Sequence, residues 1–276
     1  MTSGSVPPSA APGDRLSVTI RDHVADVRLS RADKMNALDH AMFDQLIEVG
    51  QRLGRDDEVR AIVLSGEGRA FCAGLDMGNF GKMADGAQTG LGHLAPRTHG
   101  IANRPQYAVW VWRELRVPVI AALHGVAFGG GFQLALGADM RYAAPDTRLS
   151  VMEIKWGLVP DMAGTQIMRH LAREDIVREL TYTGRIFSAE EAARYGLVTR
   201  VCDDPREQAL SVAAEIASKS PSAIRSAKRL LNTAVDGSAA DGLLAESVLQ
   251  DELIGSPEQV EAVRANLEKR APRFGR

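Results

Sequence analysis

The chain has 276 residues, of which 45% are hydrophobic and 25% are charged, and its formal net charge is −2. A chain of this size buries roughly three quarters of its unfolded surface, so it needs no disulfide or metal to hold a core. The small negative charge argues against a nucleic-acid-binding protein, because such proteins usually carry a basic surface.

The N-terminal third of the chain predicts a tail, a hairpin, a helix and a buried strand. Residues 1–14 are rich in Ser, Pro, Ala and Gly, which favours a disordered tail. Polar and apolar residues alternate over Leu16–Arg21 and Val24–Leu29, which predicts a β-hairpin. Asp39 is a candidate N-cap for a helix that runs to about Leu53. The apolar run Val59–Leu64 is typical of a strand covered on both faces.

The middle third combines glycine-rich turns with short strands and helices. Leu75–Phe80 predicts the start of a short helix, and Gly81 to Arg104 predicts a long irregular loop of the kind that often covers a binding site. Beyond this loop the pattern predicts helices and strands in alternation. They are helices over Gln106–Leu115 and Phe132–Gly137, and strands over Val117–Leu123, Met140–Ala143 and Leu149–Met152.

After Asp161 the chain is predicted to be almost entirely helical. The helical segments are Gln166–Leu171, Asp175–Tyr182, Ala189–Tyr195, Arg206–Ser218, Ala223–Val235, Gly242–Leu253 and Pro257–Arg270. Strands with helices between them, followed by helices alone, predict an α/β fold. We expect a tail over 1–14, a core over 15–200 and a C-terminal helical region over 201–276. No apolar run reaches the roughly 18 residues of a membrane span.

Two glycine-containing segments carry the clearest signs of chemistry: residues 70–77, AFCAGLDM, and residues 124–134, HGVAFGGGFQL. Each places glycine where a strand meets a loop or a helix, and a helix N-terminus presents free N–H groups. Two such N–H groups that converge on one point would form an oxyanion hole. The simpler alternative is that the glycines only turn the chain. The spacing does not match a dinucleotide-binding or P-loop motif.

These segments resemble the two oxyanion motifs of the crotonase (enoyl-CoA hydratase/isomerase) superfamily. Arg31–Leu38 resembles the segment that holds the CoA nucleotide, and residues 153–166 resemble the segment with a catalytic glutamate. The motifs follow in the family's order across roughly Leu16–Val201. The resemblance implies a crotonase-like spiral of β-β-α units with a helical C-terminal region, assembled as a homotrimer or homohexamer.

The resemblance also implies roles for individual residues. The N–H groups of Leu75 and Gly130 would hold the carbonyl oxygen of an acyl-CoA thioester. Contacts to the substrate and its CoA are expected from Lys34, Ala73, Asp76 and Met77. A solvated lysine is the alternative for Lys34, and a helix cap is the alternative for Asp76. We expect no cofactor, because coenzyme A is part of the substrate, and the scattered histidines show no metal-ligand pattern.

The expected acid and base depart from the hydratase pattern. Glu153 stands where family hydratases carry one glutamate, but Gln133 stands where they carry the other. Glutamine can orient a water molecule but cannot accept its proton. Asp161 offers a second carboxyl, and with Glu153 it resembles the arrangement in dienoyl-CoA isomerases, which usually have aspartate at position 133. An N-cap is the alternative role for Asp161, and a surface or ion-paired carboxylate is the alternative for Glu153.

We therefore predict an enzyme that isomerises a double bond in enoyl- or dienoyl-CoA, with Glu153 and Asp161 as a proton shuttle and Gln133 as a further catalytic group. Hydration of a 2-enoyl-CoA is a second hypothesis. Binding of acyl-CoA without catalysis is a third, because one glutamate is missing. The partners expected are the thioester and further copies of the chain, without nucleic acid or membrane. Two cysteines, of which Cys72 is expected to be a buried packing residue, fit a cytoplasmic protein.

Overall fold

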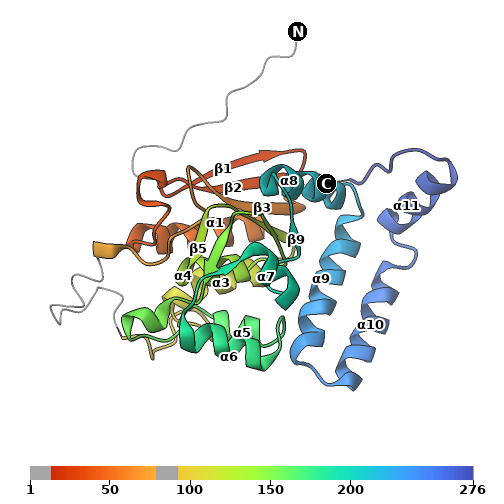
Figure 1. The fold of residues 1–276 in the computed structure, drawn as a ribbon. Helices are drawn as coiled ribbons and strands as arrows, with labels where there is room; N and C mark the ends of the chain where they lie inside the picture. The colour runs from red at the N-terminus through yellow and green to blue at the C-terminus, as the bar shows by residue number, and fades with distance from the viewer. Residues whose placement is uncertain (1–13, 79–92, 276) are drawn as a thin grey trace, which may run out of the picture.

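The computed structural model describes residues 14–78 and 93–275 of the chain. In that part, two β-sheets are surrounded by helices (Figure 1). The predicted hairpin is confirmed, since β1 (Leu16–Arg21) pairs antiparallel with β2 (Val24–Leu29). The predicted cap is also confirmed: the Asp39 side chain accepts a hydrogen bond from the N–H of Met42 at the start of α1 (His40–Arg55).

Within the described residues, the larger sheet has six strands in the order β1-β2-β3-β4-β6-β9. All pairs after the hairpin are parallel. The added strands are β3 (Ala61–Gly66), β4 (Val119–Leu123), β6 (Met140–Ala143) and β9 (Arg200–Val201). The smaller sheet has the order β5-β7-β8. Its strands are β5 (Val126–Phe128), β7 (Arg148–Ser150) and β8 (Phe187–Ser188).

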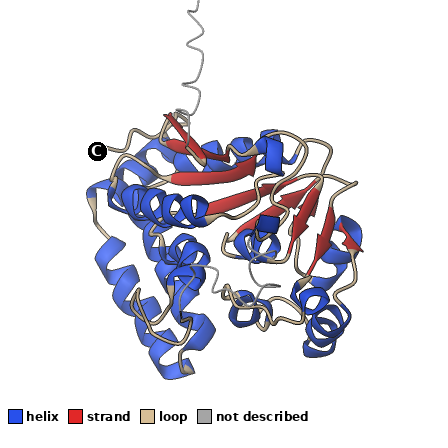
Figure 2. Ribbon diagram, turned by 90° about the vertical axis from the view of Figure 1, so that its left-hand side faces the viewer, coloured by secondary structure: helices blue, strands red, loops and turns tan. Residues whose placement is uncertain are grey.

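The chain moves between the sheets in a repeating manner. It passes through β4 in the larger sheet and β5 in the smaller one and then enters α4 (Gly130–Leu136), and it repeats the crossing with β6 and β7 before the next helical segment. This is the predicted spiral of β-β-α units, so the predicted fold is confirmed. Figure 2 shows the strands gathered together with helices packed around them.

The remaining helices follow in chain order. The first two are the short 3-10 helix η1 (Ala32–Lys34) and the helix α3 (Arg104–Glu114). The later ones are η2 (Glu153–Trp156), α5 (Gly164–Met168), α6 (Glu174–Thr183), α7 (Ala189–Tyr195), α8 (Pro205–Ala217), α9 (Pro221–Asp236), α10 (Ala239–Leu253) and α11 (Pro257–Leu267). In the part of the chain described, no helix has the length and apolar character needed to span a membrane.

The larger sheet has an apolar cluster on each face. One cluster joins the sheet to α1, α3 and α4, and its largest fully buried side chains include Phe43, Trp112 and Phe132. The other lies under α8, where alanines at every fourth position, Ala209, Ala213 and Ala217, pack on the strands. Small side chains let a helix lie close to a sheet. The helix α8 belongs to the predicted C-terminal region 201–276, but it shares a core with strands of the region 15–200. The division between these two regions therefore stays a prediction.

The C-terminal helices α9 and α10 pack against each other at one side of the molecule (Figure 1, blue). A buried lysine anchors α9 to the sheet. The Nζ of Lys228 donates to Oδ2 of Asp139 at 2.8 Å and to the carbonyl of Val117 at 2.8 Å. The same Asp139 oxygen accepts from the N–H of Val119 at the start of β4. One ion pair therefore joins the C-terminal helices to the parallel strands.

Some predicted elements differ from the structure. The strands β5, β8 and β9 were not predicted, because two or three residues are too few to show a periodic pattern. Leu75 lies in an isolated parallel bridge with Leu38, and helical backbone begins only at Met77. The rest of that predicted helix, most of the predicted tail and the first part of the Gly81–Arg104 loop lie outside the described residues.

Candidate active site

A cavity of about 980 Å³ lies where the two glycine segments meet η2 and the loop before α5. Most of the site residues predicted from the sequence line it. They are Lys34, Ala73, Leu75, Asp76, Met77, Gly130, Glu153 and Asp161. Gln133 is not among the lining residues, since it is 1% exposed and lies behind Glu153. Segments that lie far apart in the sequence thus contribute to one cavity, since its lining runs from Arg31 to Ile186.

The two glycine segments lie side by side. A parallel bridge joins Cys72 to Ala127, and a Cβ added to Gly74 would lie 2.6 Å from the carbonyl oxygen of Phe128. Gly74 has a φ of +91°, a region that favours glycine. Glycine at position 74 therefore permits both the backbone turn and the close approach of the second segment.

The backbone N–H groups of Leu75 and Gly130 are free to bind a ligand. Leu38 bonds to the carbonyl of Gly74 and to the N–H of Asp76, which leaves the N–H of Leu75 on the other side of that bridge. Gly130 is the first residue of α4, where an N–H has no partner within the helix. Among the described residues, neither group donates a backbone hydrogen bond. Both residues line the cavity, as an oxyanion hole requires.

The carboxyl group of Glu153 is buried at the wall of the cavity, with 8% of the residue exposed. Its Oε1 accepts a hydrogen bond of 2.6 Å from Nε2 of Gln133, and its Oε2 has no partner within the described residues. Burial raises the pKa of Glu153; the hydrogen bond from Gln133 opposes the increase, and the charge of Asp161 adds to it. The surface or ion-paired alternative for Glu153 is therefore wrong.

Asp161 faces the same cavity from the loop before α5. Burial raises the pKa of its carboxyl group as well. The alternative role as a helix N-cap is wrong, because the cap position of α5 is Ala163 and no side chain caps that helix. Two carboxyl groups with raised pKa values, in one cavity, are the arrangement expected of a pair that exchanges protons with a substrate.

The Arg31–Leu38 segment supports the first glycine segment. Met35 and Asn36 have φ values of +49° and +55°, and the Asn36 amide holds this turn by donating to the carbonyls of Glu67 and Ala70. Arg31 pairs with Asp76 at 2.5 Å. Individual roles for Arg31 and Asn36 were not predicted from the sequence, because Glu67, Ala70 and Asp76 lie more than 30 residues away from them.

Asp76 is a structural carboxylate. One oxygen accepts from the N–H of Gly78 and the other from Arg31. Burial alone would raise the pKa of Asp76, but these bonds outweigh burial and hold the pKa below its ordinary value. The capping alternative for Asp76 thus agrees with its contacts.

Basic and apolar groups share the remainder of the wall. Lys34, Arg69 and Lys155 supply positive charge, and the Nζ of Lys155 lies 5.4 Å from the ring centre of Trp156. Apolar lining comes from residues such as Phe43, Phe128, Leu158 and Met162. Lys155 and Arg69 were not predicted as site residues, because nothing in their local pattern distinguishes them from surface residues. The cavity can therefore accept an apolar chain that carries an anionic group.

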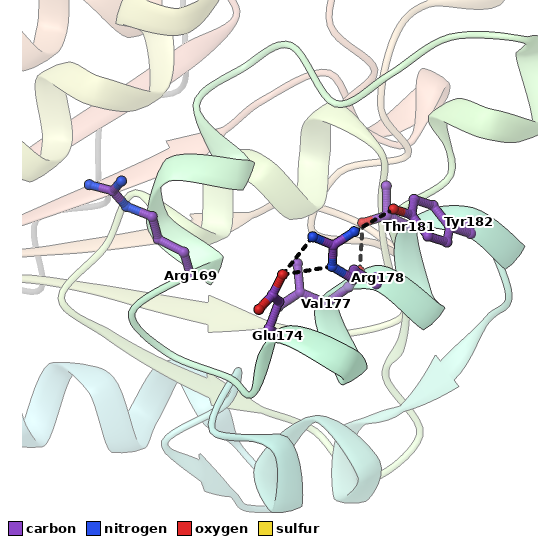
Figure 3. A pocket seen from close by; sticks show the side chains of 6 residues that line it. All are labelled: Arg169, Glu174, Val177, Arg178, Thr181 and Tyr182. Atoms are coloured by element: carbon purple, nitrogen blue, oxygen red, sulfur yellow. Dashed lines mark hydrogen bonds and ion pairs between the residues drawn. The ribbon is translucent and has the colours of Figure 1, made fainter.

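A second cavity, of about 400 Å³, is lined by residues of α6 and by Arg169, which directly follows α5 (Figure 3). Its charged groups bond to one another: Arg178 lies between Glu174 and Tyr182 and donates to both, whereas Arg169 points away from them (Figure 3). The Arg178–Glu174 pair is exposed. This cavity lacks the buried titratable groups of the first one.

Other sequence predictions concern single side chains. Cys72 is fully buried in the core, as predicted; burial raises the pKa of its thiol to about 12. His124 bonds to the carbonyl of Gly68 through Nε2 at 3.0 Å. The described residues hold no cluster of three or more His, Cys, Asp or Glu side chains suited to a metal ion.

Comparison with known proteins gives consistent matches over almost the whole chain. The family model for enoyl-CoA hydratase/isomerase matches residues 19–276. A mitochondrial Delta(3,5)-Delta(2,4)-dienoyl-CoA isomerase of Homo sapiens is 33% identical over 90% of this chain and 77% of its own. A probable enoyl-CoA hydratase of Mycobacterium bovis is also 33% identical, over 91% of this chain and 94% of its own.

Solved structures agree with these matches. A putative enoyl-CoA hydratase from Streptomyces coelicolor A3(2) superposes with a TM-score of 0.85 at 32% identity, over 100% of this chain and 99% of the other. An enoyl-CoA hydratase from Bacillus anthracis gives a TM-score of 0.84 at 30% identity, over 95% and 99% of the two chains. Proteins named as hydratases and a protein named as an isomerase are thus similar to this chain to a comparable degree.

Proposed function

The chain belongs to the enoyl-CoA hydratase/isomerase family and is an enzyme of that lyase or isomerase type, and from this premise we propose that it isomerises a double bond in an enoyl- or dienoyl-CoA. The observation that carries the proposal is the pair of carboxyl groups, buried Glu153 and partly buried Asp161, in a cavity where position 133 is an amide. Such a pair can take a proton from one carbon and return one to another.

The two carboxyl groups differ in a way that suggests their roles. Glu153 accepts a hydrogen bond from Gln133, which favours its charged form, so we assign it as the base that removes the proton alpha to the thioester. Burial favours the neutral form of Asp161, so we assign it as the acid that returns a proton further along the acyl chain. The proton gained by Glu153 must return to Asp161 before the next turnover.

The N–H groups of Leu75 and Gly130 stabilise the charge that develops on the thioester oxygen when the alpha proton leaves. Preorganised donors of this kind are typically worth about 3 kcal/mol each in the transition state. Lys34, Arg69 and Lys155 would bind the phosphates of CoA, and Ala73, Asp76 and Met77, which line the same cavity, would contact the substrate. We propose that no cofactor is needed, because a proton shuttle moves no electrons to an external acceptor.

Turnover in heavy-oxygen water tests the proposal directly. The purified enzyme is incubated with 2-enoyl-, 3-enoyl- and 3,5-dienoyl-CoA, and isomers are separated before mass spectrometry. We expect products of unchanged mass with a shifted double bond, and a turnover rate that is lower by about 10² to 10⁴ in a Glu153→Gln variant. Incorporation of one labelled oxygen would instead establish hydration, which the similar hydratases favour. Binding without turnover of any substrate would support the noncatalytic alternative.

We also propose that the chain assembles as a homotrimer or homohexamer through its C-terminal helices. The helices α9, α10 and α11 expose several large apolar side chains, and patches of this kind usually mark an interface. They are Leu231, Leu243, Leu244, Ile254 and Leu267.

For location we propose the cytoplasm, on the basis of two cysteines that are both free.

A further inference from the structure

Gln133 is one of the few fully buried polar side chains in the described part of the chain, and all its polar groups have partners. Its Nε2 donates to Oε1 of Glu153 at 2.6 Å. Its Oε1 accepts from the N–H groups of Met162 and Gly164, each at 2.9 Å. These contacts fix the orientation of the amide, because an oxygen cannot donate to a carboxylate and an NH2 group cannot accept from an N–H.

The loop that Gln133 holds is the one that carries Asp161. Between its two anchored N–H groups, Ala163 has a φ of +67°, a conformation that is unfavourable for a residue with a Cβ. Strained backbone of this kind persists only where its surroundings fix it. The two bonds to Gln133 provide that constraint, so one amide bonds both to Glu153 and to the loop beside it.

We propose that Gln133 is a positioning residue that holds Glu153 and the Asp161 loop in one fixed arrangement and directs the unpaired oxygen of Glu153 into the cavity. The proposal rests on the proposed function. Position 164 adds to it: a Cβ on Gly164 would lie 2.7 Å from both Cγ and Oε1 of Gln133, so only glycine leaves room for the amide. Gln133 itself does not line the cavity, and its action is therefore indirect.

An amide suits this position better than a carboxylate. With glutamate at 133, two carboxylate oxygens would face each other at about the present 2.6 Å, and one of the pair would have to stay protonated. The amide always donates to Glu153 and never titrates. Glutamine thus keeps Glu153 available as a base over a wider pH range than a second acid would.

Two variants disturb the amide by different routes. Gln133→Met removes its hydrogen bonds while keeping a similar volume. Gly164→Ala keeps the glutamine at position 133, but the added Cβ pushes its amide group aside. We expect each to lower kcat by at least about tenfold with KM changed less than about threefold, and to move the acidic limb of the rate profile up by about one pH unit, because Glu153 loses its donor. The matched control is Gly242→Ala, where an added Cβ meets nothing within 4 Å.

The outcomes separate this proposal from a merely structural role. A folded Gln133→Met enzyme with the wild-type pH profile and kcat would overturn it, as would a fall in kcat without any shift of the acidic limb. If the wild type turns over no enoyl- or dienoyl-CoA, the proposed function fails, and the Glu153 carboxyl is then titrated by infrared difference spectra against Glu153→Gln. A higher titration midpoint in both the Gln133→Met and Gly164→Ala backgrounds supports the arrangement; an unchanged midpoint contradicts it.

Discussion

At the scale of single residues, the carboxyl group of Glu153 opposes folding at neutral pH. Its pKa is raised by burial, so its charged form is less favourable in the folded chain than in the unfolded one. A carboxyl with a raised pKa stabilises the fold below its unfolded pKa and loses that contribution as the pH rises through the folded pKa. The enzyme therefore keeps a destabilising base where the proposed reaction needs one.

The Glu153→Gln variant should be less active and more stable. An amide at this position can accept from Gln133 through its oxygen and turn its NH2 group to the cavity, so the shape is kept while the charge is lost. We expect kcat to fall by about 10² to 10⁴, and Tm at pH 7 to rise by about 2–4 °C. The gain in Tm should vanish below about pH 4, where the wild-type carboxyl is neutral in both states. A variant that melts below the wild type at pH 7 would contradict this account.

A substitution at Gly74 tests the role of the backbone N–H donors without changing a catalytic side chain. In Gly74→Ala the new Cβ would meet the carbonyl of Phe128 at 2.6 Å and force the two glycine segments apart. The N–H groups of Leu75 and Gly130 would then no longer converge, and we expect kcat to fall about 100-fold. Gly255→Ala is a matched control, because it carries the same positive-φ penalty but meets nothing within 4 Å. Equal kcat in the two variants would argue against the oxyanion hole.

At the scale of elements, the helix α9 is joined to the sheet by an ion pair between buried Lys228 and partly exposed Asp139. Burial lowers the pKa of Lys228, and the charge and hydrogen bond of Asp139 oppose the decrease. Removal of one partner would leave Asp139 without its counter-charge and the carbonyl of Val117 without its donor. Pairs of this kind are costly to break even where their net contribution is small.

We expect Lys228→Met to lower the free energy of unfolding by about 2–3 kcal/mol. Urea unfolding monitored by circular dichroism measures this quantity. Lys219→Met, just after the end of α8, is the control, because Lys219 makes an exposed pair with Glu215 and such pairs contribute less than about 1 kcal/mol. Similar losses from the two variants would show that the buried pair does not anchor α9.

Elements with a clear pattern could be predicted from the sequence, and contacts between distant segments could not. The hairpin at Leu16–Leu29 and the Asp39 cap follow from local alternation and local chemistry. The strands β5, β8 and β9 owe their existence to neighbouring strands rather than to their own residues. In the same way, the resemblance of motifs predicted roles for Glu153 and Asp161. The bonds of Gln133 to both segments could not be predicted, because their partners lie 20 to 31 positions away in the sequence.

At the scale of the whole molecule, the exposed apolar side chains of α9, α10 and α11 predict self-assembly. We expect light scattering to give a mass of three or six chains. Leu244→Glu should reduce the mass to that of one chain or weaken the assembly at micromolar concentration, because it introduces charge among exposed leucines. Ile20→Lys is the control, since Ile20 is also exposed but belongs to β1 and not to these helices. A monomeric wild type would contradict the proposed assembly.

The division between backbone and side chains in the site has a consequence for how such enzymes diversify. The proposed oxygen-binding groups are main-chain N–H groups of Leu75 and Gly130, whose positions depend on glycine and on the spiral rather than on reactive side chains. The groups that move protons stand at positions 153 and 161, on other segments of the chain. Natural selection can therefore exchange the acid and base by single codon changes while substrate activation is inherited intact.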